Sequence, residues 1–172
     1  MADDPPPSGD YIQRSGAAAL GARLRRLSER IDRDAGRLYA ELDVRFEQRW
    51  FGVVNQLDRN GPRSVGELAA ALGVTHVSVS QVRQGLVAEG LVAEDRDPRD
   101  GRSRVLRLTE DGQALARRLA PAWTALSAAA ITLNAEAGDA LAALDRLEAA
   151  LDRASILDRA RRALEPTPGS KA

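Results

Sequence analysis

The most constraining feature of this chain is the order of local patterns that begins at residue 64. Ser64 and Glu67 have the spacing of a capping box, which starts a short helix, and Gly73 is placed to end it. Thr75 is placed to cap a second short helix directly afterwards. Two helices joined by so tight a turn are typical of a helix-turn-helix unit.

A β-hairpin is expected to follow these helices. Gly90 ends the second helix, and Leu91 and Val92 begin a strand. The next segment, RDPRDGRSR, is too polar for a core, and the apolar residues at 105–108 are typical of a returning strand. Two helices and a hairpin are the order of a winged helix-turn-helix, which presents a helix to a DNA major groove and a loop to the minor groove.

Composition favours a mainly α fold with this small β-hairpin wing. Of the 172 residues, 44% are hydrophobic but only 3% are aromatic, so Ala, Leu and Val must form the core. The chain has no cysteine and one histidine, which excludes disulfides, thiolate metal sites and cysteine catalysis. It also lacks a Gly-rich phosphate loop and a nucleophile beside a base, so we expect neither an enzyme nor a cofactor.

Three long amphipathic helices surround this central region. Apolar residues recur every three or four positions over about 17–42, from 115 to 133, and from 141 to 164. Their apolar surface exceeds what the small central domain can cover, which predicts a homodimer. The predicted organisation is a disordered tail at 1–16, helical dimerisation regions at 17–45 and 109–164, a winged helix-turn-helix at 46–108, and a disordered tail at 165–172.

The charge balance does not by itself indicate nucleic-acid binding, because 25 basic residues match 25 acidic ones. The distribution of the basic residues does indicate nucleic-acid binding, because five arginines fall close together in the predicted hairpin: Arg96, Arg99, Arg102, Arg104 and Arg107. The start of the chain is acidic and Pro-rich, and no apolar run is long enough to span a membrane. We therefore expect a cytoplasmic protein, associated with the nucleoid when it is bound to DNA.

The second helix of the helix-turn-helix presents short and amide side chains outward. With Val79, Val82 and Leu86 inward, a helical wheel places the rest of the face toward a groove, where amides and hydroxyls can read base edges. The alternative is that any exposed helix carries such residues. The predicted DNA-binding residues in and beside this helix and the wing are Thr75, His76, Val77, Ser78, Ser80, Gln81, Gln84, Arg99, Asp100, Arg102 and Arg104.

Two residues of this helix have open roles. Arg83 falls on the inner flank of the wheel, where it supports the domain, lines a cleft or contacts DNA. Gly85 costs a helix about 0.5 to 1 kcal/mol relative to alanine and could allow another backbone or a phosphate to approach.

The scarce aromatic residues gather near the junction between the long helices and the central domain. Tyr39, Phe46, Arg49 and Trp50 are therefore candidate residues for binding a small-molecule effector in a cleft there. Packing in the core is the alternative for each of them.

The run from Leu68 to Gly112 resembles the MarR family of bacterial transcription factors, most specifically in DPRDGR followed by LTEDG. The resemblance implies that Arg102 inserts into the minor groove and that Asp100 holds its guanidinium. Gly101 stands where the family often has a charged residue. RWF at 49–51 with GVTH at 73–76 is also similar to MarR-like domains that are sometimes fused to GNAT acetyltransferases, although no acetyltransferase domain is expected here.

The predicted function is that of a homodimeric regulator of transcription. Two copies of the helix and wing would bind half-sites about one helical turn apart in a pseudo-palindromic operator. Repression is the usual outcome for similar proteins, and an effector would act by favouring one spacing of the two heads. The alternative is an architectural or protein-binding winged helix with little preference for DNA sequence.

Overall fold

The computed structural model describes residues 9–96 and 104–165, which are mainly helical with one two-stranded antiparallel sheet, as the sequence predicts. Contacts divide the chain into two compact units, one ending at Trp123 and one beginning at Thr124. The described elements are α1 (Tyr11–Arg14), the 3-10 helix η1 (Gly16–Ala19), α2 (Leu20–Glu41), the 3-10 helix η2 (Gln48–Trp50), α3 (Phe51–Asn60), α4 (Val65–Leu72), α5 (His76–Ala88), β1 (Val92–Arg96), β2 (Arg104–Leu108), α6 (Glu110–Glu136), α7 (Ala140–Arg153) and α8 (Ile156–Leu164).

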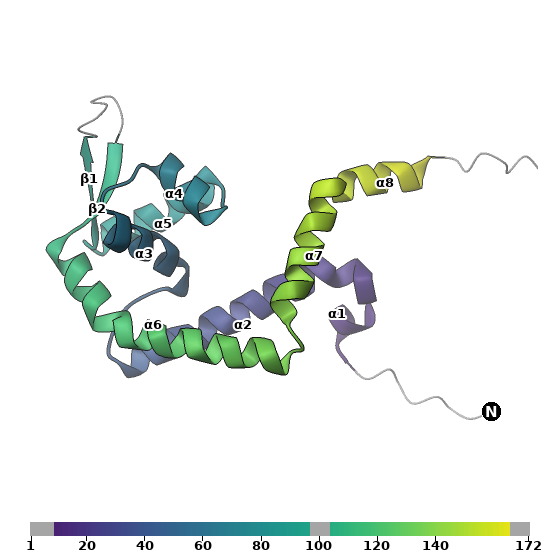
Figure 1. Ribbon diagram of the computed structural model, residues 1–172, viewed down its shortest axis with the longest axis horizontal. Helices are drawn as coiled ribbons and strands as arrows, with labels where there is room; N and C mark the ends of the chain where they lie inside the picture. The colour runs from purple at the N-terminus through teal and green to yellow at the C-terminus, as the bar shows by residue number, and fades with distance from the viewer. Residues whose placement is uncertain (1–8, 97–103, 166–172) are drawn as a thin grey trace, which may run out of the picture. The chain divides into compact units, whose positions relative to one another are not determined.

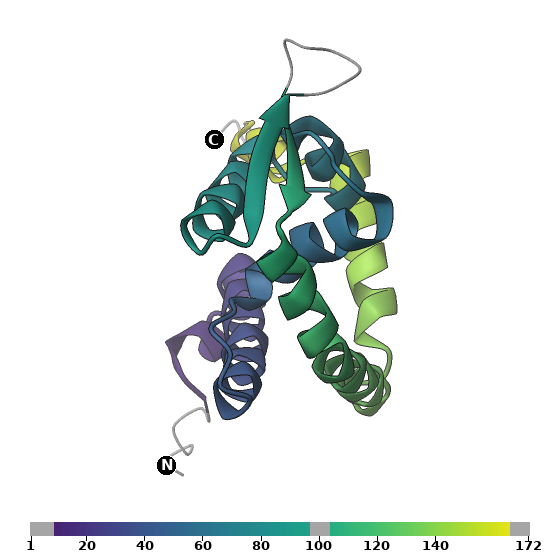
Figure 2. The same cartoon turned by 90° about the vertical axis from the view of Figure 1, so that its left-hand side faces the viewer.

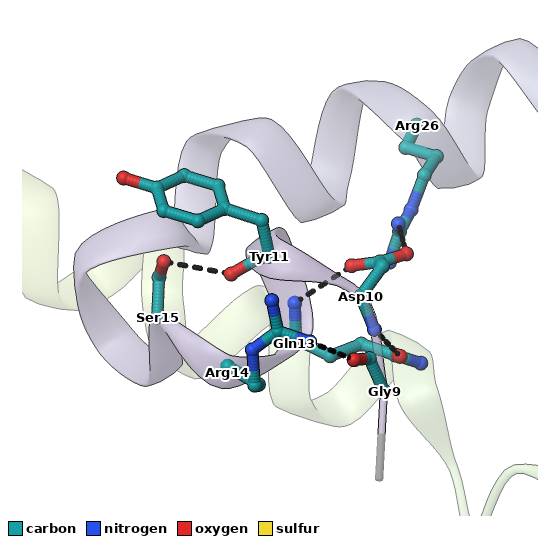
Figure 3. A network of polar contacts seen from close by, with 7 residues as sticks. All are labelled: Gly9, Asp10, Tyr11, Gln13, Arg14, Ser15 and Arg26. Carbon is teal, nitrogen blue, oxygen red and sulfur yellow. Dashed lines mark hydrogen bonds and ion pairs between the residues drawn. The ribbon is translucent and has the colours of Figure 1, made fainter. Parts of the chain in front are cut away.

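The chain is helical earlier than the sequence predicts. Asp10 and Gln13 form a capping box in which each side chain accepts the other's backbone N–H at 2.9 Å, and this starts α1 (Figure 3). The Asp10 carboxylate also pairs with Arg26 of α2. These contacts order part of the segment that was expected to be a disordered tail up to residue 16, while residues 1–8 lie outside the described range.

The helix-turn-helix forms where its capping residues predict it. The Glu67 N–H donates to Ser64 Oγ at 3.2 Å, and the Ser64 N–H donates to Glu67 Oε2 at 2.8 Å, which completes the capping box of α4. Gly73 then adopts the left-handed conformation, with φ 64° and ψ 29°, and ends the helix. Thr75 caps α5 by accepting the Ser78 N–H at 3.2 Å.

The hairpin lies beside α3 and α5 (Figures 1 and 2), and its residues Val92, Val105, Leu106 and Leu108 are buried. Its register pairs Val92 with Leu108 at the root and Arg96 with Arg104 at the far end of the described strands. On the outer side of β2, Arg63 and Leu106 exchange backbone hydrogen bonds of 3.0 and 2.8 Å. This extra bridge ties the hairpin to the segment between α3 and α4.

The root of the hairpin is also joined to the start of α6. The Thr109 N–H donates to the Leu91 carbonyl at 3.0 Å, and Thr109 Oγ1 donates to the Gly90 carbonyl at 2.7 Å. Thr109 Oγ1 in turn accepts the Gly112 N–H at 3.0 Å, as a helix cap does. A Cβ on residue 112 would lie 2.1 Å from the Leu91 carbonyl oxygen, so this junction requires glycine.

The C-terminal helical region differs from the prediction of one helix over 141–164. Ala154 takes an extended conformation, with φ −161° and ψ 125°, and separates α7 from α8. Ser155 then caps α8 in a capping box with Asp158, because its hydroxyl accepts the Asp158 N–H at 3.1 Å. Leucine spacing alone did not reveal this second helix start. Over the described residues, no helix combines the length and hydropathy needed to cross a membrane.

Candidate nucleic-acid interface

The outward face of α5 carries the side chains that the helical wheel places there. Val79, Val82 and Leu86 are buried, with 1%, 9% and 0% of their surface exposed. Val77 is 66% exposed, Gln81 and Gln84 are exposed, and Ser80 is half-buried. The exposed amides are thus free of the core, and each is of the type that can pair with adenine in a major groove.

The first turn of α5 combines a helix cap with polar side chains. Thr75 and Ser78 are both exposed, and their hydroxyl oxygens lie 2.9 Å apart. The exposed His76 ring lies over the start of α4, since a Cβ on Gly66 would be 3.5 Å from His76 Cε1. The partial positive charge at a helix N-terminus makes this turn suitable for contact with a DNA phosphate.

The hairpin brings two arginines opposite each other at the end nearest the loop. Arg96 of β1 pairs with Arg104 of β2, so both side chains share one face of the sheet, and both are exposed. The sequence prediction included Arg104 but omitted Arg96 from the DNA-binding set. The strand register was the missing signal, because it shows which arginines point the same way. Arg99, Asp100 and Arg102 lie outside the described residues.

Arg107 lies on the other face of the hairpin. Its strand position alternates with that of Leu106, and its guanidinium pairs with Asp95. A cavity of about 420 Å³ adjoins it between α3, β2 and α6, with Leu57, Gln113 and Arg117 among its other lining residues. Arg107 is therefore separated from the face that carries Arg96 and Arg104.

Arg83 connects α5 to the hairpin. Its Nη1 lies 3.1 Å from Glu94 Oε1 on β1, and the two side chains are 31% and 23% exposed. Glu94 Oε2 also lies 3.6 Å from Arg104 Nη1. The supporting role that the sequence left open for Arg83 is the one that these contacts describe. Glu94 itself was missed, because in the sequence it is one acid among several in the hairpin.

The candidate effector residues form a packed cluster. Tyr39, Phe46 and Trp50 are buried, with Tyr39 and Phe46 ring centroids 5.1 Å apart and Phe46 and Trp50 centroids 5.7 Å apart, in edge-to-face geometry. Arg49 is exposed and its Nε lies 2.5 Å from Glu47 Oε2. None of these four residues lines the cavity beside Arg107.

Comparisons with known proteins agree with this geometry. Residues 46–103 match the family model described as "MarR family". The chain is similar in structure to Staphylococcus aureus MepR in a DNA complex, with a TM-score of 0.61, 18% identity, and coverage of 76% of this chain and 97% of that one. It is also similar to PcaV of Streptomyces coelicolor with its natural ligand, with a TM-score of 0.58, 21% identity, and coverage of 87% and 99%.

A third similar structure is the transcriptional repressor CouR bound to a 23-mer DNA duplex. Its TM-score is 0.54, its identity to this chain is 29%, and the match covers 76% of this chain and 92% of that one. No curated protein sequence matches the chain. The helix-turn-helix and β1 lie within the residues that match the MarR family model, and the three structures named above share the fold of this chain.

Proposed function

We propose that this chain is a repressor that binds a pseudo-palindromic operator as a homodimer and leaves it when a small molecule binds. The observation that carries the proposal is the outward face of α5, where exposed Gln81 and Gln84 accompany Val77. Beside this helix, the hairpin carries Arg96 and Arg104 on one face. A helix with amide side chains and an arginine-bearing wing suit the major groove and its flanking minor groove.

In this proposal each part of the site has a distinct task. Gln81 and Gln84 read base edges, Val77 contacts a thymine methyl, and Ser80 accepts or donates to a base. Thr75, His76 and Ser78 lie at the N-terminus of α5 and contact the phosphate backbone. The wing residues Arg99, Asp100, Arg102 and Arg104 complete the contact, with Arg102 in the minor groove as the resemblance to the MarR family implies.

Exposed apolar residues support a second copy of the chain as the partner. On α2 they follow one stripe, with Leu20, Leu24, Leu27 and Ile31 exposed by 42%, 37%, 52% and 54%. The C-terminal helices expose more: Leu141, Leu144, Leu151, Ile156, Leu157 and Leu164. Apolar surface of this extent is unfavourable in water, and a symmetric pair of chains buries it.

The dimer is tested by changing one residue of the α2 stripe. Leu27→Glu places a charge in the proposed interface and is expected to give a monomer in sedimentation equilibrium. The control is Ser28→Glu, which adds the same charge at the neighbouring position beside the stripe. A variant Leu27→Glu that stays dimeric at micromolar concentration would remove α2 from the interface.

A small-molecule effector is proposed at the cluster of Tyr39, Phe46, Arg49 and Trp50. PcaV, which is similar in structure, is known in complex with its natural ligand. In this chain the rings of Tyr39, Phe46 and Trp50 are in mutual contact, so a ligand there must separate them. Because Trp50 also contacts α5 at Gly85, such a movement would reach the DNA-reading helix.

Selection from a library of random DNA duplexes tests the function directly. The purified protein is expected to enrich an inverted repeat whose half-sites are about 10 bp apart, and to bind it at least about 1,000-fold more tightly than random DNA. Enrichment of no common sequence, with binding that only weakens as salt rises, would indicate the architectural alternative and refute the proposal.

A further inference from the structure

We propose that Glu94 is a positioning residue that fixes the hairpin against α5 and so sets the relation between the DNA-reading helix and the wing. The inference rests on the proposed function for its role in DNA binding, but its structural part concerns the protein alone. Glu94 itself does not contact DNA. It acts through Arg83 and Arg104.

The Glu94 carboxylate lies between two arginines, one on α5 and one on β2. Glu94 Oε1 lies 3.1 Å from Arg83 Nη1 on α5, and Glu94 Oε2 lies 3.6 Å from Arg104 Nη1 on β2. One carboxylate thus links the helix and both strands of the hairpin. Because Glu94 and Arg83 are largely shielded from water, with side-chain exposures of 23% and 31%, their attraction is screened less than that of a surface pair.

Positive charges of both strands lie on the same face of the sheet as Glu94. The register places Arg96 directly opposite Arg104, and both lie on the same face as Glu94 because strand positions alternate. Like charges directly opposite each other on a sheet are destabilising. Arg83 approaches this face from α5, so the Glu94 carboxylate lies between the guanidiniums of Arg83 and Arg104, with Arg96 on the same face. Removing the Glu94 charge therefore leaves the arginines of this end of the hairpin repelled from Arg83 of the helix.

Glu94 lies beyond the part of the hairpin that other contacts hold in place. The root is already fixed, because Val92 and Leu108 are buried and Leu91 accepts the Thr109 N–H. Glu94 lies further along β1, between this root and the Arg96 end of the strand. Its ion pairs therefore control the part of the hairpin that leads into the wing, and they leave Arg104 73% exposed for contact with DNA.

The direction in which DNA affinity changes distinguishes a positioning role of Glu94 from a simple effect of its charge. Removing an acidic charge should strengthen DNA binding if only the net charge mattered, because DNA is an anion. Loss of the wing position should weaken it. Asp95→Asn is the matched control, since Asp95 is the next residue of β1, carries the same charge and pairs with Arg107 on the other face.

The experiment compares the full-length Glu94→Gln and Asp95→Asn variants with the wild type. The probes are the duplex recovered by selection and a random duplex of equal length. Glu94→Gln is expected to bind the selected duplex about 3- to 10-fold more weakly, which corresponds to the loss of one partly buried ion pair. Asp95→Asn is expected to bind it as tightly as the wild type or more tightly. In DNA-free protein, amide hydrogen exchange of β1 and β2 is expected to be faster in Glu94→Gln than in Asp95→Asn.

A charge exchange identifies the partner. Arg83→Glu alone should weaken DNA binding, and the double variant Glu94→Arg with Arg83→Glu should recover part of the affinity. If each substitution merely damaged the structure, the affinity losses of the two single variants would instead add up in the double variant. Urea unfolding of every variant establishes that each is folded under the conditions of the binding measurement.

Two results would overturn the inference: equal exchange of the hairpin in the Glu94→Gln and Asp95→Asn variants, or equal effects of both on the selected duplex. If the wild type enriches no sequence, the proposed function fails instead. The exchange comparison then still decides whether Glu94 holds the hairpin in place.

Discussion

The indole ring of Trp50 lies directly against the backbone of α5 at Gly85. A Cβ on residue 85 would be 3.0 Å from Trp50 Cζ2 and 3.1 Å from Nε1, closer than ordinary van der Waals contact. Trp50 is 2% exposed, so the ring has little room to move away. This contact explains a glycine in the middle of a helix, where alanine would be favoured by about 0.5 to 1 kcal/mol.

Gly85→Ala is therefore expected to destabilise the protein although alanine favours helix. The added methyl group has to displace the buried ring, which costs about 1 to 3 kcal/mol in a packed core. Urea unfolding measures the change in the free energy of unfolding. Trp50→Phe provides space at the same contact, so Gly85→Ala should cost less in that background. An equal cost in both backgrounds would show that the indole is not the obstacle.

Gly112→Ala should be more damaging, because its Cβ would meet backbone and not a side chain. The added atom would lie 2.1 Å from the Leu91 carbonyl oxygen, which accepts the Thr109 N–H. We expect a loss of about 3 kcal/mol or more, or no folded protein. The matched control is Gly36→Ala in α2, where a Cβ would meet no atom within 4 Å and helix propensity should stabilise the protein. Equal stability of the two variants would show that a Cβ at residue 112 does not clash with the Leu91 carbonyl.

The parts of the fold that could be predicted from sequence are those fixed by local rules. The capping box of Ser64 and Glu67, the left-handed Gly73 and the inward Val79 follow from neighbours within one or two turns. The same rules apply to Ser155, yet the leucine periodicity over 141–164 hid its capping box with Asp158. A strong periodic pattern can thus conceal a break that a single extended residue, Ala154, is enough to make.

The site was predictable where exposure follows from helix geometry and not where it depends on strand pairing. The outward position of Gln81 follows from a wheel. The pairing of Arg96 with Arg104, and the ion pair of Arg83 with Glu94, depend on which residues meet across the hairpin. One shift of register would place Glu94 on the opposite face, so the sequence alone could not select it.

Gln81→Ala tests the reading face of α5. If the amide pairs with a base, the variant should lose about 1 to 3 kcal/mol of binding free energy at one position of the selected duplex and little on random DNA. Val87→Ala is the control, since Val87 is exposed on the same helix but lies near its C-terminal end. Affinities for duplexes with single base changes give the measurement. A uniform loss over all sequences would make Gln81 a phosphate contact instead.

Arg102→Ala tests the wing residue that the resemblance to the MarR family singles out. If Arg102 enters a narrow minor groove, its loss should weaken binding to the selected duplex by about 10-fold while the protein stays folded. Arg107→Ala removes the same charge from the face of the sheet opposite Arg96 and Arg104, where Asp95 pairs with it, and should have a smaller effect. Both affinities are compared at one fixed salt concentration. Equal losses of affinity in the two variants would show that the wing contributes only its overall charge.

Tyr39 should make the stability of the protein fall at alkaline pH. Burial raises the pKa of its phenol above the ordinary value of about 10, and the carboxylate of Asp32 acts in the same direction. The unfolded chain therefore loses the phenolic proton at a lower pH than the folded chain, so the free energy of unfolding decreases as the pH rises past about 10. Tyr39→Phe should remove this part of the slope, at a cost of about 1 kcal/mol near neutral pH for the lost hydrogen bond to Gln48. Urea unfolding across the alkaline range measures it, and Tyr11→Phe, at a ring that is 77% exposed, should leave the slope as in the wild type. If Tyr39→Phe retains the full slope, another group is responsible and the phenol of Tyr39 ionises as readily in the folded chain as in the unfolded one.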